Sequence, residues 1–284
     1  MQILNTTSQM QSWSIEKKKR GRSISFVPTM GFLHQGHVSL LEIGKPLCDE
    51  LVLSIFVNPI QFGANEDLDK YPSDIERDLA LAEKAGVTAV FLPDKSQIYP
   101  ERFQTEIRLQ QLPNHLCGQF RPGHFAGVAT VVTKLFNIVM PDVAVFGQKD
   151  YQQLQIIRQL TIDLDFNIRI IPGPIVREPD GLAMSSRNAY LSETHRRSAL
   201  SLYQSLNKAE KMIAGGETDA AIIRQAIETF IHDFDETEVE YIRFCNPATL
   251  DDMDPLQTPL LMALAVKVGT TRLIDNALFK TTSQ

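Results

Sequence analysis

The chain lacks the features that mark secreted, membrane-spanning and zinc-binding proteins. Its cysteines, Cys48, Cys117 and Cys245, are odd in number and far apart. They therefore predict neither a disulfide framework nor a C-x-x-C metal site. The N-terminus has no apolar signal segment, and no run of 18 apolar residues occurs anywhere in the chain. We expect a cytoplasmic protein that does not associate with a membrane.

Basic residues are fewer than acidic ones. There are 28 Lys and Arg against 34 Asp and Glu, which gives a net charge of −6. A surface that binds nucleic acid requires clustered Lys and Arg, so no nucleic-acid partner is expected. The one basic cluster, at residues 17–20 with Arg22, is typical of the solvated end of a helix.

What the sequence does contain is an alternation of apolar strands and amphipathic helices over its first two-thirds. Apolar runs at residues 23–27, 51–57, 89–92, 143–146 and 168–171 alternate with helical patterns such as 75–85 and 128–139. Near-continuous apolar strands separated by helices indicate a parallel sheet that is covered on both faces. The alternation stops near residues 177–181. Two helical patterns (193–214 and 219–234) and two strands (239–244 and 260–268) follow.

The predicted fold class is therefore α/β, a Rossmann-like doubly wound parallel sheet with a smaller C-terminal α+β domain. We place the nucleotide-binding domain at residues 1–177 and a lid domain at residues 178–284. Functional residues are expected at the carboxyl ends of the strands, where open α/β sheets bind ligands.

The most informative segment, at residues 27–37, follows the first of these apolar runs. It carries the H-x-G-H motif of His34, Gly36 and His37 immediately before a helical pattern. The start of a helix presents backbone N–H groups and a positive dipole end, which together favour phosphate. Two plainer interpretations stay open: a surface turn that happens to carry two histidines, and a neutral His37 that only caps the helix.

Further motifs follow along the chain. They are the segments 56–62, 121–125 and 146–154, and then a Met-Ser-Ser-Arg loop within residues 180–188. Together with H-x-G-H, these motifs resemble the pantothenate synthetase family over residues 23–188. The resemblance implies that ATP, pantoate and β-alanine are the substrates. Pantoate would attack the α-phosphate of ATP to give pantoyl adenylate and pyrophosphate, and β-alanine would then displace AMP.

The resemblance also implies the site residues. His37, His34, Lys149 and Arg187 would be catalytic, because the transition state spreads negative charge over phosphate oxygens and needs donors and cations. Gln61 and Gln155 would bind pantoate, and Gln61 would also contact β-alanine. The residues implied to bind ATP are Met30, Gly31, Phe32, Leu33, His34, Gln35, Gly36, His37, Gly147, Lys149, Asp150, Tyr151, Gln152, Val176, Met184, Ser185, Ser186 and Arg187.

The chain departs from related patterns at two positions. Gln148 stands where the family usually has a glutamate, and Arg187 replaces the lysine that is common in tRNA synthetases. Arginine keeps the charge and offers a planar fork of donors, so a phosphate-binding role is retained. The segment 121–124 has no role that the residues themselves suggest. Asp74, Glu76 and Asp78 form an acidic stretch, which we interpret as complementing a helix dipole.

Magnesium is expected to be carried on the phosphates, with no dedicated protein ligands. A homodimer is expected from the resemblance alone. Two rival functions stay open: a nucleotidyltransferase that adds AMP or CMP to a phosphorylated acceptor, and a nucleotide-binding regulatory module without turnover. The four catalytic candidates disfavour the regulatory module, and the two glutamines disfavour the nucleotidyltransferase. Chain length and the lack of a basic tRNA-binding region exclude a tRNA synthetase.

Overall fold

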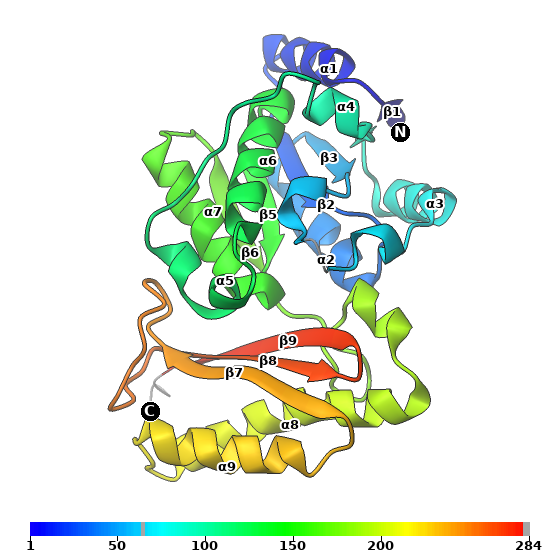
Figure 1. Cartoon of the computed structure of the whole chain (residues 1–284). Coiled ribbons are helices and arrows are strands. Elements are labelled where there is room, and N and C mark those ends of the chain that lie inside the picture. Colours follow the sequence, from blue (N-terminus) through cyan, green and yellow to red (C-terminus); the bar gives the residue numbers. More distant parts are fainter. Residues whose placement is uncertain (64–65, 281–284) are drawn as a thin grey trace. The chain divides into compact units, whose positions relative to one another are not determined.

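A computed structural model describes residues 1–63 and 66–280 of the chain. Its larger sheet has six strands, all paired in parallel, in the spatial order β1-β4-β3-β2-β5-β6 (Figure 1). The strands are β1 (Gln2–Leu4), β2 (Ile24–Thr29), β3 (Glu50–Ile55), β4 (Ala89–Phe91), β5 (Val143–Gly147) and β6 (Arg169–Gly173). The predicted parallel sheet is confirmed. The short edge strand β1 was not predicted, because three residues are too few to show a periodicity.

Helices alternate with these strands, as predicted. They are α1 (Thr7–Lys19), α2 (Gln35–Gly44), α3 (Ile75–Ala85), α4 (Lys95–Ile98), α6 (His124–Val139) and α7 (Tyr151–Asp163). The basic cluster forms the C-terminal end of α1, and Gly86 ends α3 in the left-handed conformation. Short 3-10 turns are η1 (Lys45–Leu47), η2 (Pro59–Gln61), η3 (Leu68–Lys70), η4 (Leu112–Asn114) and η5 (Gln148–Asp150).

Both faces of the larger sheet are buried. Side chains alternate between the two faces along a strand, so Val27 and Val145 point one way and their neighbours Phe26 and Ala144 point the other. All four are 0% exposed. The first face packs with residues of α2 and α3 in one apolar cluster, to which Leu33 of the loop after β2 also belongs. This loop is therefore tied to the core at its centre.

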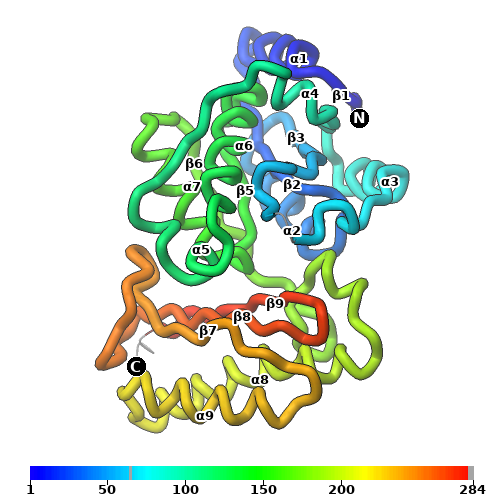
Figure 2. The backbone as a smooth tube through the Cα atoms, in the orientation of Figure 1, coloured from blue at the N-terminus to red at the C-terminus, as the bar shows by residue number. Residues whose placement is uncertain are grey.

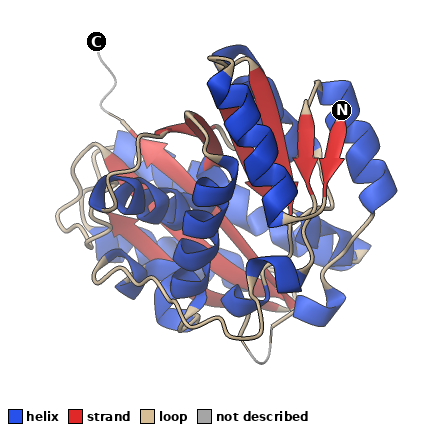
Figure 3. Cartoon of the chain, turned by 90° about the horizontal axis from the view of Figure 1, so that it is seen from above, coloured by secondary structure: helices blue, strands red, loops and turns tan. Residues whose placement is uncertain are grey.

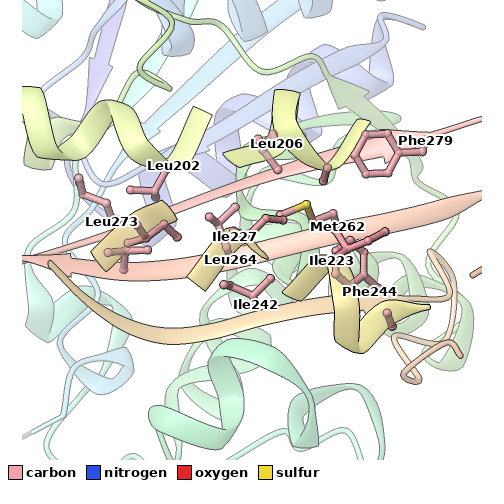
Figure 4. Close-up of a cluster of buried hydrophobic side chains, with 14 of the residues drawn as sticks. Leu202, Leu206, Ile223, Ile227, Ile242, Phe244, Met262, Leu264, Leu273 and Phe279 are labelled. Atoms are coloured by element: carbon pink, nitrogen blue, oxygen red, sulfur yellow. The ribbon is translucent and has the colours of Figure 1, made fainter. Parts of the chain in front are cut away.

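The C-terminal part contains an antiparallel sheet and two long helices. The sheet has the order β7-β8-β9, and its strands are β7 (Thr237–Cys245), β8 (Leu260–Val268) and β9 (Thr271–Phe279). The helices are α8 (Glu193–Ala214) and α9 (Ala220–His232); the shorter η6 (Ser186–Tyr190) precedes them. Strand β9 was not predicted. Figure 4 shows the buried side chains through which the helices and the sheet pack together, among them Leu206, Ile227, Phe244 and Met262.

The chain divides into two compact units. Unit 1 contains residues Met1–Pro113, Arg121–Gln148 and Gln153–Pro174, and unit 2 contains Asn114–Phe120 with α5 (Leu116–Phe120), Lys149–Gln152 and Ile175–Gln284. Figure 2 traces the path of the chain, and Figure 3 shows the helices and strands of each unit in a second view. The division of function between residues 1–177 and 178–284 stays a prediction. Each unit is described by itself below.

Candidate active site

The order of strands in unit 1 contains a switch point between β2 and β5. From β2 the chain adds β3 and then β4 on one side of the sheet, and later adds β5 and β6 on the other. In open α/β sheets, ligands bind beyond the carboxyl ends of the strands at such a point. The H-x-G-H motif directly follows β2, and Gly147 ends β5. The topology therefore favours the predicted nucleotide-binding position.

The two histidines lie at the start of α2. His34 is the N-cap residue, and its Nδ1 atom accepts a hydrogen bond from the Gly36 N–H at 3.1 Å. The Nδ1 atom of His37 accepts one from the His34 N–H at 3.3 Å, and the two ring centroids are 4.0 Å apart. A neutral imidazole that accepts at Nδ1 carries its proton on Nε2. Capping therefore occupies the same nitrogen in both rings and makes Nε2 the donor.

The backbone ahead of these histidines is strained. Gly31 has φ +86° and Phe32 has φ +50°, so two consecutive residues adopt the left-handed conformation. We call residues 31–37 the histidine turn. The carboxylate of Asp78 on α3 accepts hydrogen bonds from the N–H groups of Phe32 and Leu33, both at 2.7 Å.

Asp78 makes a contact that the dipole interpretation of the acidic stretch did not include. Within the acidic stretch, Asp74 does behave as expected, since it is the N-cap of α3 and accepts from the Arg77 N–H at 3.1 Å. Asp78, by contrast, is 0% exposed and points into the protein. Burial raises its pKa, and the two backbone hydrogen bonds act in the opposite direction.

Gln61, predicted to bind pantoate, lies in η2 just beyond β3 and is buried. Its Oε1 atom accepts from Asn58 Nδ2 at 3.0 Å, and its Nε2 atom lies 3.2 Å from the sulfur of Met30. Asn58 is in turn oriented by the Tyr99 hydroxyl, which donates to its Oδ1 atom at 2.7 Å, and by the Gly127 carbonyl, which accepts from Nδ2 at 3.1 Å. The amide of Gln61 is therefore held in one orientation.

The segment 121–124, whose role the sequence did not suggest, supports the backbone of Gln61. His124 Nδ1 lies 2.8 Å from the Gln61 carbonyl, and Arg121 Nη1 lies 3.1 Å from His124 Nε2. Arginine can only donate, so this His124 ring is neutral and carries its proton on Nδ1. Arg121 also forms an ion pair with Glu66. Burial alone would raise the pKa of Glu66, but several contacts, led by those with Arg121, together hold the pKa below its ordinary value.

Gly127 on α6 allows this helix to lie against η2. A Cβ atom at this position would come within 2.6 Å of the Ile60 carbonyl oxygen and 2.8 Å of the Gln61 backbone. Real side chains do not tolerate such contacts, so only glycine fits. The second predicted pantoate ligand, Gln155, is buried on α7 within unit 1.

Several predicted ATP-binding residues belong to unit 2. The carbonyl of Lys149 accepts from Asn276 Nδ2 at 2.9 Å, which ties η5 to β9. Tyr151 and Gln152 are buried, and Gln152 Nε2 donates to the His115 carbonyl at 2.7 Å. Asp150 is exposed, and the Lys149 side chain is half-buried.

The Met-Ser-Ser-Arg segment forms the second turn of interest, residues 176–188, which we call the arginine turn. Its backbone pairs with itself through Met184 N to Val176 O at 3.0 Å and Glu178 N to Leu182 O at 2.8 Å. Ser185 is the N-cap of η6 and accepts from the Arg187 N–H at 3.3 Å, while Ser186 is buried.

Ion pairs hold the arginine turn to its surroundings in unit 2. Arg177 binds both carboxylate oxygens of Asp275 on β9, at 2.6 and 3.0 Å, and Arg196 on α8 pairs with Glu178 and Asp180. The side chain of Asp275 is 2% exposed, whereas those of Arg196, Glu178 and Asp180 are 24–34% exposed. The turn is thus anchored at one buried point and at several exposed ones.

Unit 1 brings the histidine turn and Gln61 to the ends of adjacent strands, because Thr29 of β2 pairs in register with Ile55 of β3. Sequence reasoning placed Asn58 at the same strand end as Gln61 but gave it no role of its own. It missed Tyr99 and the contact that Asp78 makes, because nothing local marks either. In the part of the chain that is described, no cluster of three or more His, Cys, Asp or Glu forms a metal site. No described helix is long and apolar enough to span a membrane.

Comparison with known proteins gives concordant results. The family model described as "Pantoate-beta-alanine ligase" matches residues 2–278. A pantothenate synthetase from Desulforapulum autotrophicum is 59% identical over 276 residues, covering 97% of this chain and 98% of that protein. One from Desulfatibacillum aliphaticivorans is 57% identical over 277 residues, covering 97% and 98%.

Solved structures agree with the sequence relatives. The crystal structure of pantothenate synthetase from Thermus thermophilus has a TM-score of 0.92 at 39% identity, covering 98% of this chain and 99% of that one. A pantoate-beta-alanine ligase from Francisella tularensis, complexed with "Beta-gamma ATP and Beta-alanine", has a TM-score of 0.83 at 34% identity and covers 98% and 97%.

Proposed function

The chain belongs to the pantoate–β-alanine ligase family, and we propose that the site described above condenses pantoate with β-alanine at the expense of ATP through a pantoyl adenylate. The predicted fold, family and enzyme class agree with this membership. The roles of individual residues are our proposal and follow from their geometry.

In the first step, a carboxylate oxygen of pantoate attacks the α-phosphorus of ATP, and the bond to pyrophosphate breaks. Negative charge develops on the phosphate oxygens, so catalysis depends on preorganised donors. His34 and His37 have Nε2 as the donor nitrogen and lie at the positive end of α2. We assign both to the phosphates, with His37 also able to donate a proton to the departing group.

Pantoate carries hydroxyl groups and a carboxylate, which an amide side chain can bind both as donor and as acceptor. Gln61 and Gln155 are both buried amides in unit 1, which supports their assignment to pantoate. Gln61 is the better defined of the two, because the contact with Asn58 fixes which end of its amide is the oxygen. In the second step the β-alanine amine attacks the acyl carbon, and AMP leaves. Gln61 is also assigned to β-alanine.

Unit 2 is proposed to supply two cations to ATP, Lys149 and Arg187, and two hydroxyl donors, Ser185 and Ser186. Arg187 and Ser185 are half-buried, and Ser185 also begins η6. The other assigned ATP residues are those expected from the resemblance. Magnesium enters this proposal on the triphosphate, where, when bound, it neutralises charge on the phosphate oxygens. A cytoplasmic homodimer also stays a proposal.

The single observation that carries the proposal is the pair of Nδ1-capped histidines at the switch point of the parallel sheet. The test measures AMP release from ATP with pantoate and β-alanine, each omitted in turn. Pyrophosphate exchange into ATP should require pantoate and not β-alanine. AMP release without pantoate, or pyrophosphate release with a phosphorylated acceptor in place of pantoate, would refute the proposal.

Gln155→Ala examines the pantoate assignment. A buried amide removed from a polar ligand costs about 1–3 kcal/mol. We therefore expect the KM for pantoate to rise by roughly 5–150-fold while the KM for ATP changes little. Gln159→Ala, an exposed position on the same helix, is the control and should behave like the unmodified protein. Equal rises in both KM values would show that α7 itself was disturbed.

A further inference from the structure

We propose that Asp78 is a positioning residue for the reaction: its buried carboxylate holds the histidine turn in the conformation that presents His34 and His37. The inference rests on the proposed function for its catalytic consequence. Its structural part, an anchored turn, can be measured without any activity. Asp78 lies on α3, a different element from the residues that it holds.

The contact is a short, two-pronged one. Asp78 Oδ2 accepts from the Phe32 N–H and Oδ1 from the Leu33 N–H, both at 2.7 Å. Hydrogen bonds to a carboxylate at this distance are charge-assisted and stronger than those between neutral groups. Neither N–H belongs to a helix or a strand, and the carboxylate accepts a hydrogen bond from both.

The turn requires such an anchor because its backbone is strained. Phe32 is a non-glycine residue at φ +50°, next to Gly31 at φ +86°. L-residues avoid this conformation unless the surrounding structure imposes it. Leu33, fully buried in the apolar core cluster, fixes the turn from its side chain. Asp78 fixes the turn through the backbone N–H groups of Phe32 and Leu33. Leu33 is followed directly by His34, the N-cap of α2.

A carboxylate is a costly choice for this position. Asp78 is 0% exposed, and burial of its charge raises its pKa. Helix α3 already has its own capping residue in Asp74 and an acidic first turn with Glu76. Helix dipole complementarity therefore does not require a third acidic residue turned inward. The hydrogen bonds to Phe32 and Leu33 explain why this acidic residue points inward.

Asp78 and Ile55 also fill the space next to Gly31. A Cβ atom at Gly31 would lie 3.2 Å from Asp78 Oδ2 and 3.0 Å from Ile55 Cγ2. The carboxylate thus lies close against the glycine as well as against the next two N–H groups. If Asp78 moved, the Phe32 and Leu33 N–H groups would lose their acceptors, and Gly31 would lose a packing contact. The backbone that precedes His34 and His37 would then no longer be fixed.

The first experiment uses Asp78→Asn, which keeps the size of the side chain but removes its charge. The amide NH2 group would then face one of the two backbone N–H donors, from which it cannot accept a hydrogen bond. We expect kcat for pantoate-dependent pyrophosphate exchange to fall at least about tenfold, with the KM for pantoate unchanged, because Gln61 and Gln155 lie on other elements. Two controls accompany it. Asp74→Asn keeps a good helix cap, and Ala80→Gly destabilises the same helix at an exposed position outside the turn.

The comparison separates positioning from stability. If Ala80→Gly lowers the melting temperature as much as Asp78→Asn but keeps its kcat, the loss in Asp78→Asn comes from the turn. If Asp78→Asn keeps a normal kcat, or if Ala80→Gly loses as much, the inference is wrong. An unmodified protein without pantoate-dependent exchange would instead refute the proposed function.

A second measurement needs neither a variant nor activity. Hydrogen exchange of the unmodified protein, followed by NMR, should show the Phe32 and Leu33 amides protected at least about 100-fold relative to an unstructured chain, although they lie in a loop. Should Asp78→Asn fail to fold, this result still decides whether the turn is anchored. Unprotected amides at both positions would overturn the inference.

Discussion

The histidine turn and the arginine turn are both assigned to ATP, but the protein holds them by different means. The histidine turn is held by one fully buried carboxylate that accepts from two N–H groups at 2.7 Å. The arginine turn is held by its own backbone hydrogen bonds and by ion pairs, most of which are partly exposed. The first turn therefore depends on two buried groups, the Asp78 carboxylate and the Leu33 side chain, whereas the second depends on many contacts that are mostly partly exposed.

This difference predicts how each turn tolerates damage. Exposed ion pairs each contribute little, because water and salt screen them. A buried charge that loses its partner is expensive, because the charge is left without solvation. Single substitutions should therefore have large effects at the histidine turn and at the one buried anchor of the arginine turn. Elsewhere in the arginine turn their effects should be small.

The largest effect is expected on the rate when the histidine turn loses a donor. His37→Ala should slow pyrophosphate exchange by about 10²–10³-fold, the usual cost of removing one donor from developing charge. The fold should stay intact by circular dichroism. His195→Ala in unit 2, whose ring pairs with Glu236, is the control and should retain its activity. Near-normal exchange in His37→Ala would remove this histidine from the mechanism.

The buried anchor of the arginine turn should give the largest loss of stability. Arg177→Ala leaves Asp275 without its partner, and we expect the free energy of unfolding to fall by about 2–4 kcal/mol. Arg196→Ala breaks only the partly exposed pairs with Glu178 and Asp180, and should cost about 0–1 kcal/mol. Urea denaturation of both variants measures the difference. Equal losses would contradict the distinction between buried and exposed anchors.

Gly127→Ala sharpens the comparison at Gln61, whose backbone is held by packing as well as by hydrogen bonds. The added methyl group would overlap the η2 backbone, which typically costs about 1–3 kcal/mol. We also expect the KM for pantoate to rise, because Gln61 is displaced. Asn137→Ala, at an exposed position on the same helix, is the matched control. A variant with unchanged stability and KM would show that α6 can move away freely.

The smallest effect concerns acid stability. Several contacts, led by those with Arg121, hold the pKa of Glu66 below its ordinary value of 4.5, although burial opposes this shift. A lowered carboxyl pKa contributes stability that is complete above 4.5 and is lost as the pH falls through the folded-state value. The melting temperature of the unmodified protein should therefore approach that of Glu66→Gln as the pH falls from roughly 6 to 3. A constant difference over this range would rule out the ion pair as its source.

The sequence by itself determined the parallel sheet and where the candidate site residues lie relative to its strands. Near-continuous apolar strands require cover on both faces, and β2 is indeed followed directly by His34 and His37. It also placed Gln61 beyond the neighbouring strand, because a parallel register aligns the ends of β2 and β3. These predictions succeeded because strand period and strand-end position are properties of contiguous residues.

Only the tertiary structure decided which groups hold these residues in place. Asp74 and Asp78 are one helical turn apart, and both satisfy the dipole of α3, so the sequence offers no reason to separate them. Folding leaves Asp74 as the helix cap and buries Asp78 against the Phe32 and Leu33 amides, 46 and 45 residues away in the chain. His124 reaches the Gln61 carbonyl across a separation of 63 residues. Such contacts join elements whose approach depends on the packing of the whole core, and no local pattern encodes them.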